Sequence, residues 1–163
     1  MNRRLTEKVF VMGIDGMDPR YTKKMLAQGR MPNLQKFLDQ GAAREDLVML
    51  GGQPTVTPPM WTTLATGAYA NTHGITGFYR ASQKGLEYQG YNLDSRNSKA
   101  EPLWNCFAEA GKKTLVFTWP GSSWPPSSDN ENLYVVDGSQ PAAVQMSTAS
   151  VDFEKYAIAN KDF

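Results

Sequence analysis

The sequence predicts an α/β protein with a mainly parallel β-sheet sandwiched by helices. Segments 8–15, 113–119 and 133–137 are continuously apolar or nearly so, as is typical of strands buried on both faces. Segments whose apolar residues follow helical spacing separate these runs, and alternation of strands with helices favours a parallel sheet. With 163 residues, the chain is long enough for one domain with a proper core.

Two short helices are expected after the first strand. Asp18 is a good N-cap and Pro19 suits the first helical position, while Gly29 closes the segment. Pro32 then opens a helix over 33–40, which ends before a glycine.

The remaining elements follow in chain order. We expect a strand over 43–50, a helix over 58–66, a short strand over 86–91 and a helix over 102–110. The two helices carry apolar residues that are predicted to face the core, namely Met60, Trp61 and Leu64 in the first and Leu103, Trp104 and Phe107 in the second.

Composition and charge exclude some classes of partner. The formal net charge of +1 gives no electrostatic reason to expect a nucleic-acid polymer or an anionic membrane as partner. The apolar run 9–14 is too short for a signal peptide and no stretch is long enough to span a membrane. We therefore expect a soluble, cytoplasmic protein, or a periplasmic one if a leader precedes this sequence. The oligomeric state does not follow from the sequence.

Cys106 is the only cysteine and lies in an apolar segment with helical spacing. A single cysteine forms no internal disulfide and lacks a partner for a thiolate metal site. We interpret it as a small buried hydrophobic residue.

Asp15 closes the first predicted strand. Ligands of open α/β sheets bind beyond the carboxyl ends of the strands, and a carboxylate there is a hard oxygen ligand for a divalent metal. The alternative is a polar strand terminus or a cap without a metal.

Thr57 directly precedes Pro58 and is predicted to be the N-cap of the helix that follows. An N-cap hydroxyl has a structural role that is worth about 1 kcal/mol. The same position can also favour a phosphate or a threonine alkoxide, because a helix start attracts negative charge. Pro58 and Pro59 remove two N–H donors, so a metal would have to supply most of the charge stabilisation.

His73 is the only histidine and lies in the segment Thr72-His73-Gly74. It could ligate a metal or act as a base, but one histidine does not build a zinc site alone. We interpret it as a structural, hydrogen-bonded histidine in a glycine-rich turn.

These segments together resemble the nucleotide pyrophosphatase/phosphodiesterase branch of the alkaline-phosphatase superfamily. The resemblance rests on order and spacing from about 9 to 122. The similar segments are VFVMGIDG at 9–16, MPNL at 31–34 followed by Gly41-Ala42, PTVTPPMWTTLATG at 54–67, NTHGI at 71–75, PLW at 102–104, Gly111-Lys112-Lys113 and WPGS at 119–122.

The resemblance implies metal-dependent hydrolysis of a small-molecule phosphate ester, either a phosphodiester or a phosphomonoester. Asp15 would be a metal ligand, and Thr57 would be both a metal ligand and the nucleophile that forms a phospho-threonine intermediate. The divalent metals would be two zinc ions, with manganese as an alternative. Residues 1–163 would form the N-terminal part of a single alkaline-phosphatase-like catalytic domain.

Two departures from the family pattern affect this hypothesis. Phe78 stands where phosphodiesterases of the family carry an asparagine that holds a phosphate oxygen, so another phosphoester or a phosphonate becomes more plausible. The later aspartate and histidine ligand motifs are also absent from the sequence. We therefore expect the sequence to be part of a longer enzyme that supplies these ligands.

Other function classes are also considered. A non-catalytic α/β domain that binds an anion or a partner at the Thr57 helix start is the main alternative. A sulfatase of the same superfamily needs a Cys-x-Pro-x-Arg-like motif, which the residues after Cys106 do not supply. A dinucleotide-binding domain is disfavoured, since the sequence from Gly13 lacks the glycine spacing that lets a pyrophosphate approach.

Overall fold

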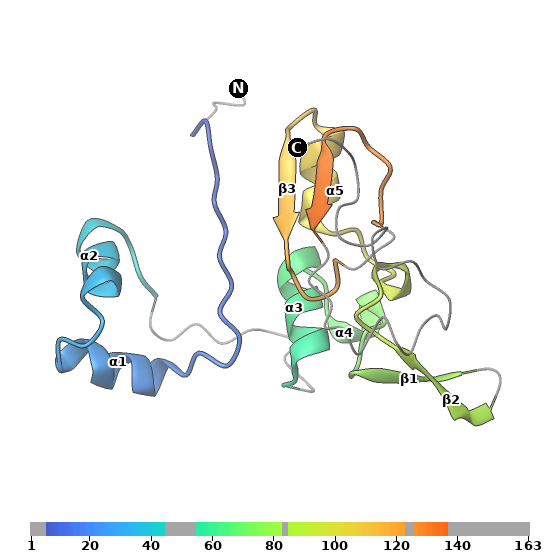
Figure 1. The fold of residues 1–163 in the computed structure, drawn as a ribbon, viewed down its shortest axis with the longest axis horizontal. Helices are drawn as coiled ribbons and strands as arrows, with labels where there is room; N and C mark the ends of the chain where they lie inside the picture. Colours follow the sequence, from blue (N-terminus) through green and yellow to red (C-terminus); the bar gives the residue numbers. More distant parts are fainter. Residues whose placement is uncertain (1–5, 45–54, 83–84, 123–125, 137–163) are drawn as a thin grey trace. The chain divides into compact units, whose positions relative to one another are not determined.

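The computed structural model describes residues 6–44 and 55–136, apart from 83–84 and 123–125 (Figure 1). The chain divides into two compact units, Met1–Leu47 and Val48–Phe163, which are described separately. No helix in the described part of the chain combines the length and the apolar composition that crossing a membrane requires.

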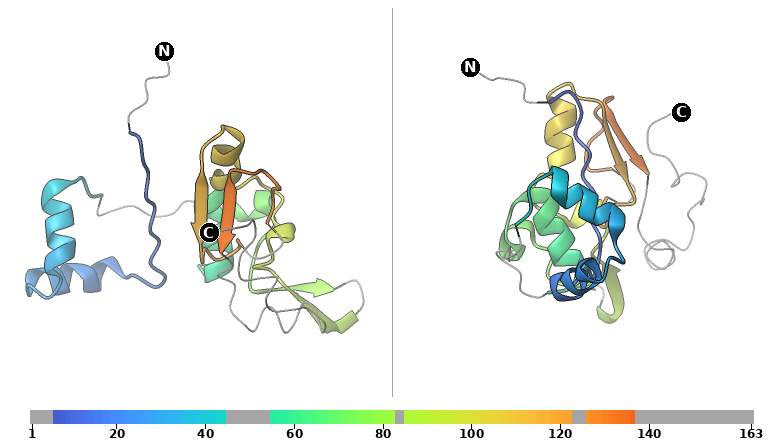
Figure 2. Two further views of the ribbon diagram at one scale, coloured as in Figure 1. Left: turned by 45° about the horizontal axis from the view of Figure 1, so that its top comes forward. Right: turned by 90° about the vertical axis from the view of Figure 1, so that its left-hand side faces the viewer.

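The first unit contains two helices that agree with the sequence prediction (Figure 2). Helix α1 spans Pro19–Ala27 and helix α2 spans Pro32–Gln40. The Asp18 carboxylate accepts a hydrogen bond from the Arg20 backbone N–H at 2.8 Å, which confirms Asp18 as the N-cap of α1. Gly29 turns the chain after α1 with φ of 67°, a conformation that glycine adopts without steric cost.

The expected first strand does not form. Residues 8–15 carry no strand pairing, and Val9 and Phe10 are 68% and 88% exposed. A strand buried on both faces needs neighbours that accept its backbone hydrogen bonds and cover its side chains, and the described residues of this unit provide none. The strand expected over 43–50 falls mostly outside the described residues.

The second unit contains the remaining elements. In chain order they are α3 (Thr57–Thr66), α4 (Ala70–His73), β1 (Tyr79–Ser82), β2 (Gly85–Tyr91), the short 3-10 helix η1 (Ser95–Asn97), α5 (Leu103–Glu109), β3 (Thr114–Phe117) and β4 (Leu133–Val136). Strands β1 and β2 form an antiparallel hairpin, whereas β3 and β4 pair in parallel. The α/β class is therefore confirmed, whereas the mainly parallel sheet is found only in part, because the described strands form one parallel and one antiparallel pair in two separate sheets.

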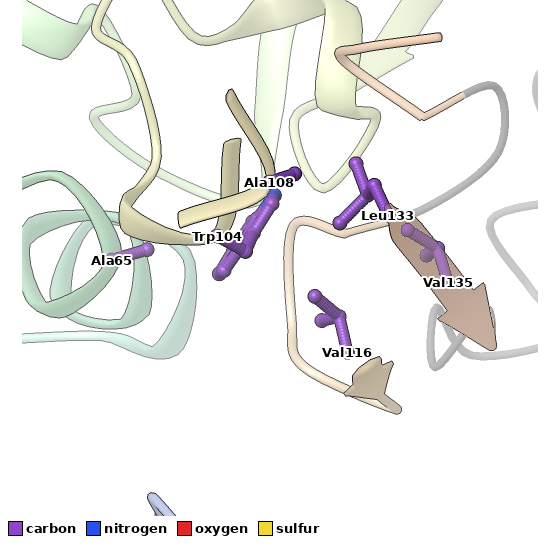
Figure 3. Close-up of a cluster of buried hydrophobic side chains, with 6 residues drawn as sticks. All are labelled: Ala65, Trp104, Ala108, Val116, Leu133 and Val135. Atoms are coloured by element: carbon purple, nitrogen blue, oxygen red, sulfur yellow. The ribbon is translucent and has the colours of Figure 1, made fainter. Parts of the chain in front are cut away.

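The core of this unit lies between the β3–β4 sheet and two helices (Figure 3). Val116, Leu133 and Val135 point from the sheet toward Trp104 and Ala108 of α5, and Ala65 of α3 completes the cluster. Burial alternates along both strands, as a sheet with one covered face requires. The register pairs Val116 with Val135, so the apolar side chains of the two strands gather on the same face.

The residues of α5 that face the core are not all those that the sequence predicted. Trp104, Asn105 and Ala108 are buried, whereas Phe107 is exposed. Cys106 is also exposed, so its interpretation as a buried residue was wrong. Two residues turn an α-helix by about 200°, so a helix that buries Trp104 directs Cys106 toward solvent.

The inward face of α3 also differs. Trp61 is buried as predicted, but Leu64 is exposed, and Thr62 and Thr63 are buried. The Thr62 hydroxyl donates to the Pro58 carbonyl at 2.7 Å. Because this bond satisfies the hydroxyl inside its own helix, burial of the threonine does not leave an unpaired polar group.

Leucines on the two paired strands provide a matched test of this core. Leu133 of β4 has 0% exposure and Leu115 of β3 is 56% exposed. We predict that Leu133→Ala lowers the free energy of unfolding by about 2–5 kcal/mol, because it leaves a cavity in the core. Leu115→Ala should lower the free energy of unfolding by well under about 1.5 kcal/mol, because this side chain is already exposed to solvent. Urea denaturation followed by tryptophan fluorescence measures both, and equal losses would contradict the assignment of the inner face.

Candidate functional site

Thr57 is the first residue of α3, whereas the sequence predicted it as the N-cap. Val56 holds the cap position with an extended backbone (φ −125°, ψ 161°), and its carbonyl accepts a hydrogen bond from Met60 N–H at 3.2 Å. The difference arises because prolines fit several positions of a first helical turn, so Pro58 does not fix the start to a single residue. The Thr57 side chain is half-buried at this helix start.

The start of α3 offers few backbone donors. Pro58 and Pro59 are both fully buried and neither has an N–H group. Since Met60 N–H already bonds within the helix, Thr57 has the only N–H among the first three helical residues. An anion bound here would therefore need positive charge from another source, in agreement with the sequence-based expectation.

The turn after β3 packs against the middle of α3. The Trp119 indole N–H donates to the Trp61 carbonyl at 3.4 Å, and the two rings meet edge-to-face with centroids 4.8 Å apart. The Trp119 ring also meets Trp104 of α5 at 6.0 Å. Gly121 lies close to Thr62, since a Cβ on Gly121 would come 3.8 Å from the Thr62 hydroxyl oxygen. The carboxyl end of β3 thus leads to the part of α3 that follows Thr57.

The direction of this turn depends on one unusual backbone conformation. Thr118 has φ of 50°, which is uncommon for a β-branched residue. Its N–H still donates to the Val136 carbonyl at 3.0 Å, so the chain leaves the sheet immediately after this bond. This bend directs Trp119 toward α3 and α5.

His73 is a buried structural residue. Its Nδ1 accepts a hydrogen bond from Ile75 N–H at 3.1 Å, so the ring proton resides on Nε2, which lies 3.0 Å from the Thr63 hydroxyl. Burial lowers the pKa of the imidazole below its ordinary value of 6.5, and a contact with the Pro59 backbone opposes this shift only in part. Both ring nitrogens are engaged, which matches the structural interpretation of this histidine.

Asp15 and Asp18 have different surroundings in the first unit. Asp15 is exposed and lies at a turn with Gly16, whose φ is 67°. Asp18 caps α1 and pairs with the Arg20 guanidinium at 2.7 Å, which lowers the pKa of the carboxyl to about 2. Because Asp15 and Thr57 belong to different units, their meeting at one cation remains a prediction.

The described residues contain no preformed metal-binding cluster. Within 6–44 and 55–136, apart from 83–84 and 123–125, no three side chains of histidine, cysteine, aspartate or glutamate lie together in a way that could hold a metal ion. Within that part of the chain, the oxygen ligands proposed for a metal are those of Asp15 and Thr57. Carboxylate and hydroxyl oxygens suit hard divalent cations, so the two donors fit a metal in their chemistry.

A cavity of about 370 Å³ lies in the second unit and was not expected from the sequence. Its walls come from the Thr62 and Thr66 side of α3, the segment 92–102, the turn 120–121 and the residues 126–127. Most of these residues lie in loops without apolar periodicity, so sequence patterns carry no signal for the cavity. Thr57 does not line it.

The chain belongs to the type I phosphodiesterase / nucleotide pyrophosphatase family, whose model matches residues 9–161. Bis(5'-adenosyl)-triphosphatase enpp4 of Xenopus laevis is 32% identical over 125 residues, which cover 72% of this chain and 25% of that protein. Venom phosphodiesterase of Naja atra is 27% identical over 132 residues, covering 76% of this chain and 14% of the venom enzyme. No solved structure matches the chain.

These relatives confirm the family resemblance seen in the sequence. The family implies an alkaline-phosphatase-like fold and is typically metal-dependent. The chain spans a quarter or less of the length of the two relatives.

The buried histidine predicts a specific pH dependence of stability. The folded state holds His73 neutral with a pKa below that of the unfolded chain, so the unfolded state binds more protons below about pH 6.5. Stability should therefore be complete above this pH and decrease as the pH falls, with a limiting slope of about 1.4 kcal/mol per pH unit. Urea denaturation between about pH 5 and 8 measures the slope.

His73→Gln is the control, because the chain contains no other histidine. This variant should be less stable at neutral pH. Its free energy of unfolding should also no longer depend on pH near pH 6 as that of the wild type does. An unchanged slope in the variant would show that other groups produce the pH dependence.

Proposed function

We propose that Thr57 is the nucleophile of a metal-dependent phosphoric ester hydrolase and that Asp15 is one of its metal ligands. The observation that carries the proposal is the place of Thr57 in the second unit. It opens α3, and the turn after the carboxyl end of β3 packs against the same helix one turn further on. Ligands in open α/β sheets bind at this end of the strands.

The reaction proposed for Thr57 has two displacements. The Oγ atom forms a bond to phosphorus while the bond from phosphorus to the leaving oxygen breaks, and the hydroxyl proton ends on the departing oxygen. Water then cleaves the phospho-threonine, which restores the hydroxyl and releases the second product.

Bound divalent metal would supply the positive charge that lowers the pKa of the hydroxyl and stabilises the oxygens on phosphorus. Asp15 and Thr57 would hold it through their oxygens. The two prolines at the start of α3 are consistent with such a cation, because they leave few N–H donors for the phosphate. Zinc is the first metal to test and manganese the second.

The relatives favour nucleotide phosphoesters as the first substrates to test, since one of them is named a bis(5'-adenosyl)-triphosphatase. Phe78 argues for testing other phosphoesters and a phosphonate beside them. The half-buried Phe78 packs against Leu93, and its ring has no hydrogen-bond donor for a phosphate oxygen. Residues 1–163 are proposed as the N-terminal part of one catalytic domain, whose further metal ligands come from the rest of a longer protein.

The role of Thr57 is tested by mutation in the protein that contains this sequence, together with the further segment proposed above. Thr57→Ala should reduce turnover of a chromogenic phosphodiester by at least about a thousandfold, because the attacking oxygen is lost. Thr57→Ser keeps a hydroxyl and should retain measurable turnover. Thr72→Ala, an exposed threonine on α4, is the control and should behave like the wild type. Wild-type turnover in Thr57→Ala would rule out this nucleophile and would favour a non-catalytic, anion-binding role for the helix start.

The metal requirement is tested by chelation. EDTA should abolish turnover, and added zinc or manganese should restore it. Asp15→Ala should raise the metal concentration needed for half-maximal activity by about tenfold or more, because one ligand is lost. Asp39→Ala is the matched control, since Asp39 lies exposed on α2 and bonds to Gln35. The same metal requirement in both variants would remove Asp15 from the metal site.

The isolated 163-residue chain should show negligible turnover with any of these metals. Robust metal-dependent turnover by this chain would contradict the proposal that further ligands are needed.

A further inference from the structure

Asp15 and Gly16 form an exposed aspartyl-glycyl pair in the first unit. Both residues belong to the turn that precedes α1. Gly16 has φ of 67°, and a Cβ added to it would meet no atom within 4 Å, so the space beside this residue is open. No described residue accepts a backbone hydrogen bond from the Gly16 N–H. The pair is therefore not fixed by a helix or a sheet.

A glycine that follows an aspartate favours attack of the backbone on the side chain. The amide nitrogen of the following residue can attack the carboxyl carbon of the aspartate, because this reaction closes a five-membered ring. A side chain on the following residue hinders the approach, and glycine has none. The reaction also requires freedom of the backbone, which an exposed turn provides without local unfolding.

The other described aspartates lack at least one of these conditions. Asp18 precedes Pro19, whose nitrogen carries no hydrogen. Asp39 lies within α2, where the helix fixes the backbone. Asp94 and Asp129 are followed by a serine and an asparagine, whose side chains hinder the attack. In the described part of the chain, only the turn before α1 combines exposure with a following glycine.

We propose that Asp15 and Gly16 form a site of spontaneous isomerisation, at which Asp15 becomes an isoaspartate. The Gly16 nitrogen forms a bond to the Asp15 Cγ atom, and its hydrogen leaves with the carboxyl hydroxyl as water, which gives a cyclic imide. Water then attacks the former backbone carbonyl carbon of Asp15 and breaks the bond from this carbon to the nitrogen. The chain stays connected through Cγ. Attack of water at Cγ instead restores the aspartate, and no step needs an oxidant or a reductant.

The product differs from aspartate in both the main chain and the carboxylate. The main chain gains one carbon atom, because it now runs through Cβ and Cγ, and the free carboxylate stands directly on Cα. A metal ligand has to keep its position to within about 0.5 Å. If Asp15 holds a metal, its conversion would therefore remove this oxygen from the metal site. This consequence rests on the proposed function, whereas the isomerisation does not.

A time course with the 163-residue chain tests the isomerisation directly. The metal-free chain is kept in water enriched in the heavy oxygen isotope and is then digested. Mass spectrometry measures the isotope in the peptide that contains Asp15, and the separate elution of the isoaspartyl form measures the product. A synthetic peptide of residues 11–20 is the reference for an unprotected pair.

We expect the chain to form isoaspartate at a rate within about tenfold of that of the synthetic peptide, because the exposed turn needs no local opening. A rate that is more than about tenfold slower than that of the peptide would overturn the proposal, since the folded chain would then protect the pair.

Two variants identify the reacting atoms. Gly16→Ala should slow the conversion by at least about tenfold, because the added methyl group hinders the nitrogen. Asp15→Glu keeps a carboxylate but would need a six-membered ring, so it should give no isomer. Gly29→Ala is the matched control, since Gly29 also has φ of 67° and open space around it but follows a glutamine. Equal rates in Gly16→Ala and Gly29→Ala would contradict the proposal.

A last experiment separates this proposal from the proposed function. The protein that contains this sequence, together with the further segment proposed above, is stored with EDTA and then supplied with zinc. Turnover should fall in step with the formation of isoaspartate at position 15. Isoaspartate without loss of turnover would establish the modification and remove Asp15 from the metal site. Thr57→Ala should form isoaspartate at the wild-type rate, so failure of the proposed nucleophile leaves this site unaffected.

Discussion

The arrangement of the second unit depends on the contact of Trp119 with α3 and α5. The indole packs edge-to-face on Trp61, meets Trp104 and donates a hydrogen bond to the Trp61 carbonyl. Aromatic contacts of this geometry contribute about 0.5–1.5 kcal/mol beyond the burial of their area. The contact connects the residues that directly follow β3 to α3, the helix that begins with Thr57. Together with Ala65 of α3, which packs in the core cluster, it holds the helix against the end of the strand.

A second set of polar contacts supports the same unit from inside. Thr63 and His73 join α3 to the α4 turn, and the His73 carbonyl holds the backbone of Lys99. On α5, Asn105 makes similar connections, because its side-chain amide donates hydrogen bonds to Glu101 and Ser127. These buried groups are satisfied by one another, which is the condition under which a polar core is tolerated. Three of the residues that they bond to, Lys99, Glu101 and Ser127, line the cavity, so its shape depends in part on these internal contacts.

Sequence patterns predicted the elements whose signals are local. Asp18 with Pro19 marked the start of α1, and the apolar runs near the end of the described chain gave β3 and β4. Patterns failed where tertiary packing decides the outcome. Apolar character alone did not make a strand of residues 8–15, because a strand forms only beside a partner. Cys106 was assigned to the core because its neighbours are apolar, although helical geometry turns it outward.

For similar reasons, only part of the candidate site could be predicted from the sequence. Thr57 was identified by its place before two prolines, but the exact helix start was missed by one residue. Family motifs suggested Thr57 and Asp15 together, and their meeting at one cation is still a prediction. The cavity and Asn105 had no sequence signal, since an asparagine in an apolar helix is ambiguous until its partners four and 22 residues away are known. Short elements such as α4 and η1 were missed because three or four residues are too few for periodicity.

The most direct test of the central claim is to trap the covalent intermediate. The protein that contains this sequence is mixed with substrate, quenched in acid within one turnover and digested, and the peptide that contains Thr57 is examined by mass spectrometry. The proposed mechanism predicts a phosphoryl adduct on the Thr57 oxygen. A phosphoryl adduct on a different residue would contradict this mechanism. So would the absence of any adduct in a sample that was quenched during a burst of product formation.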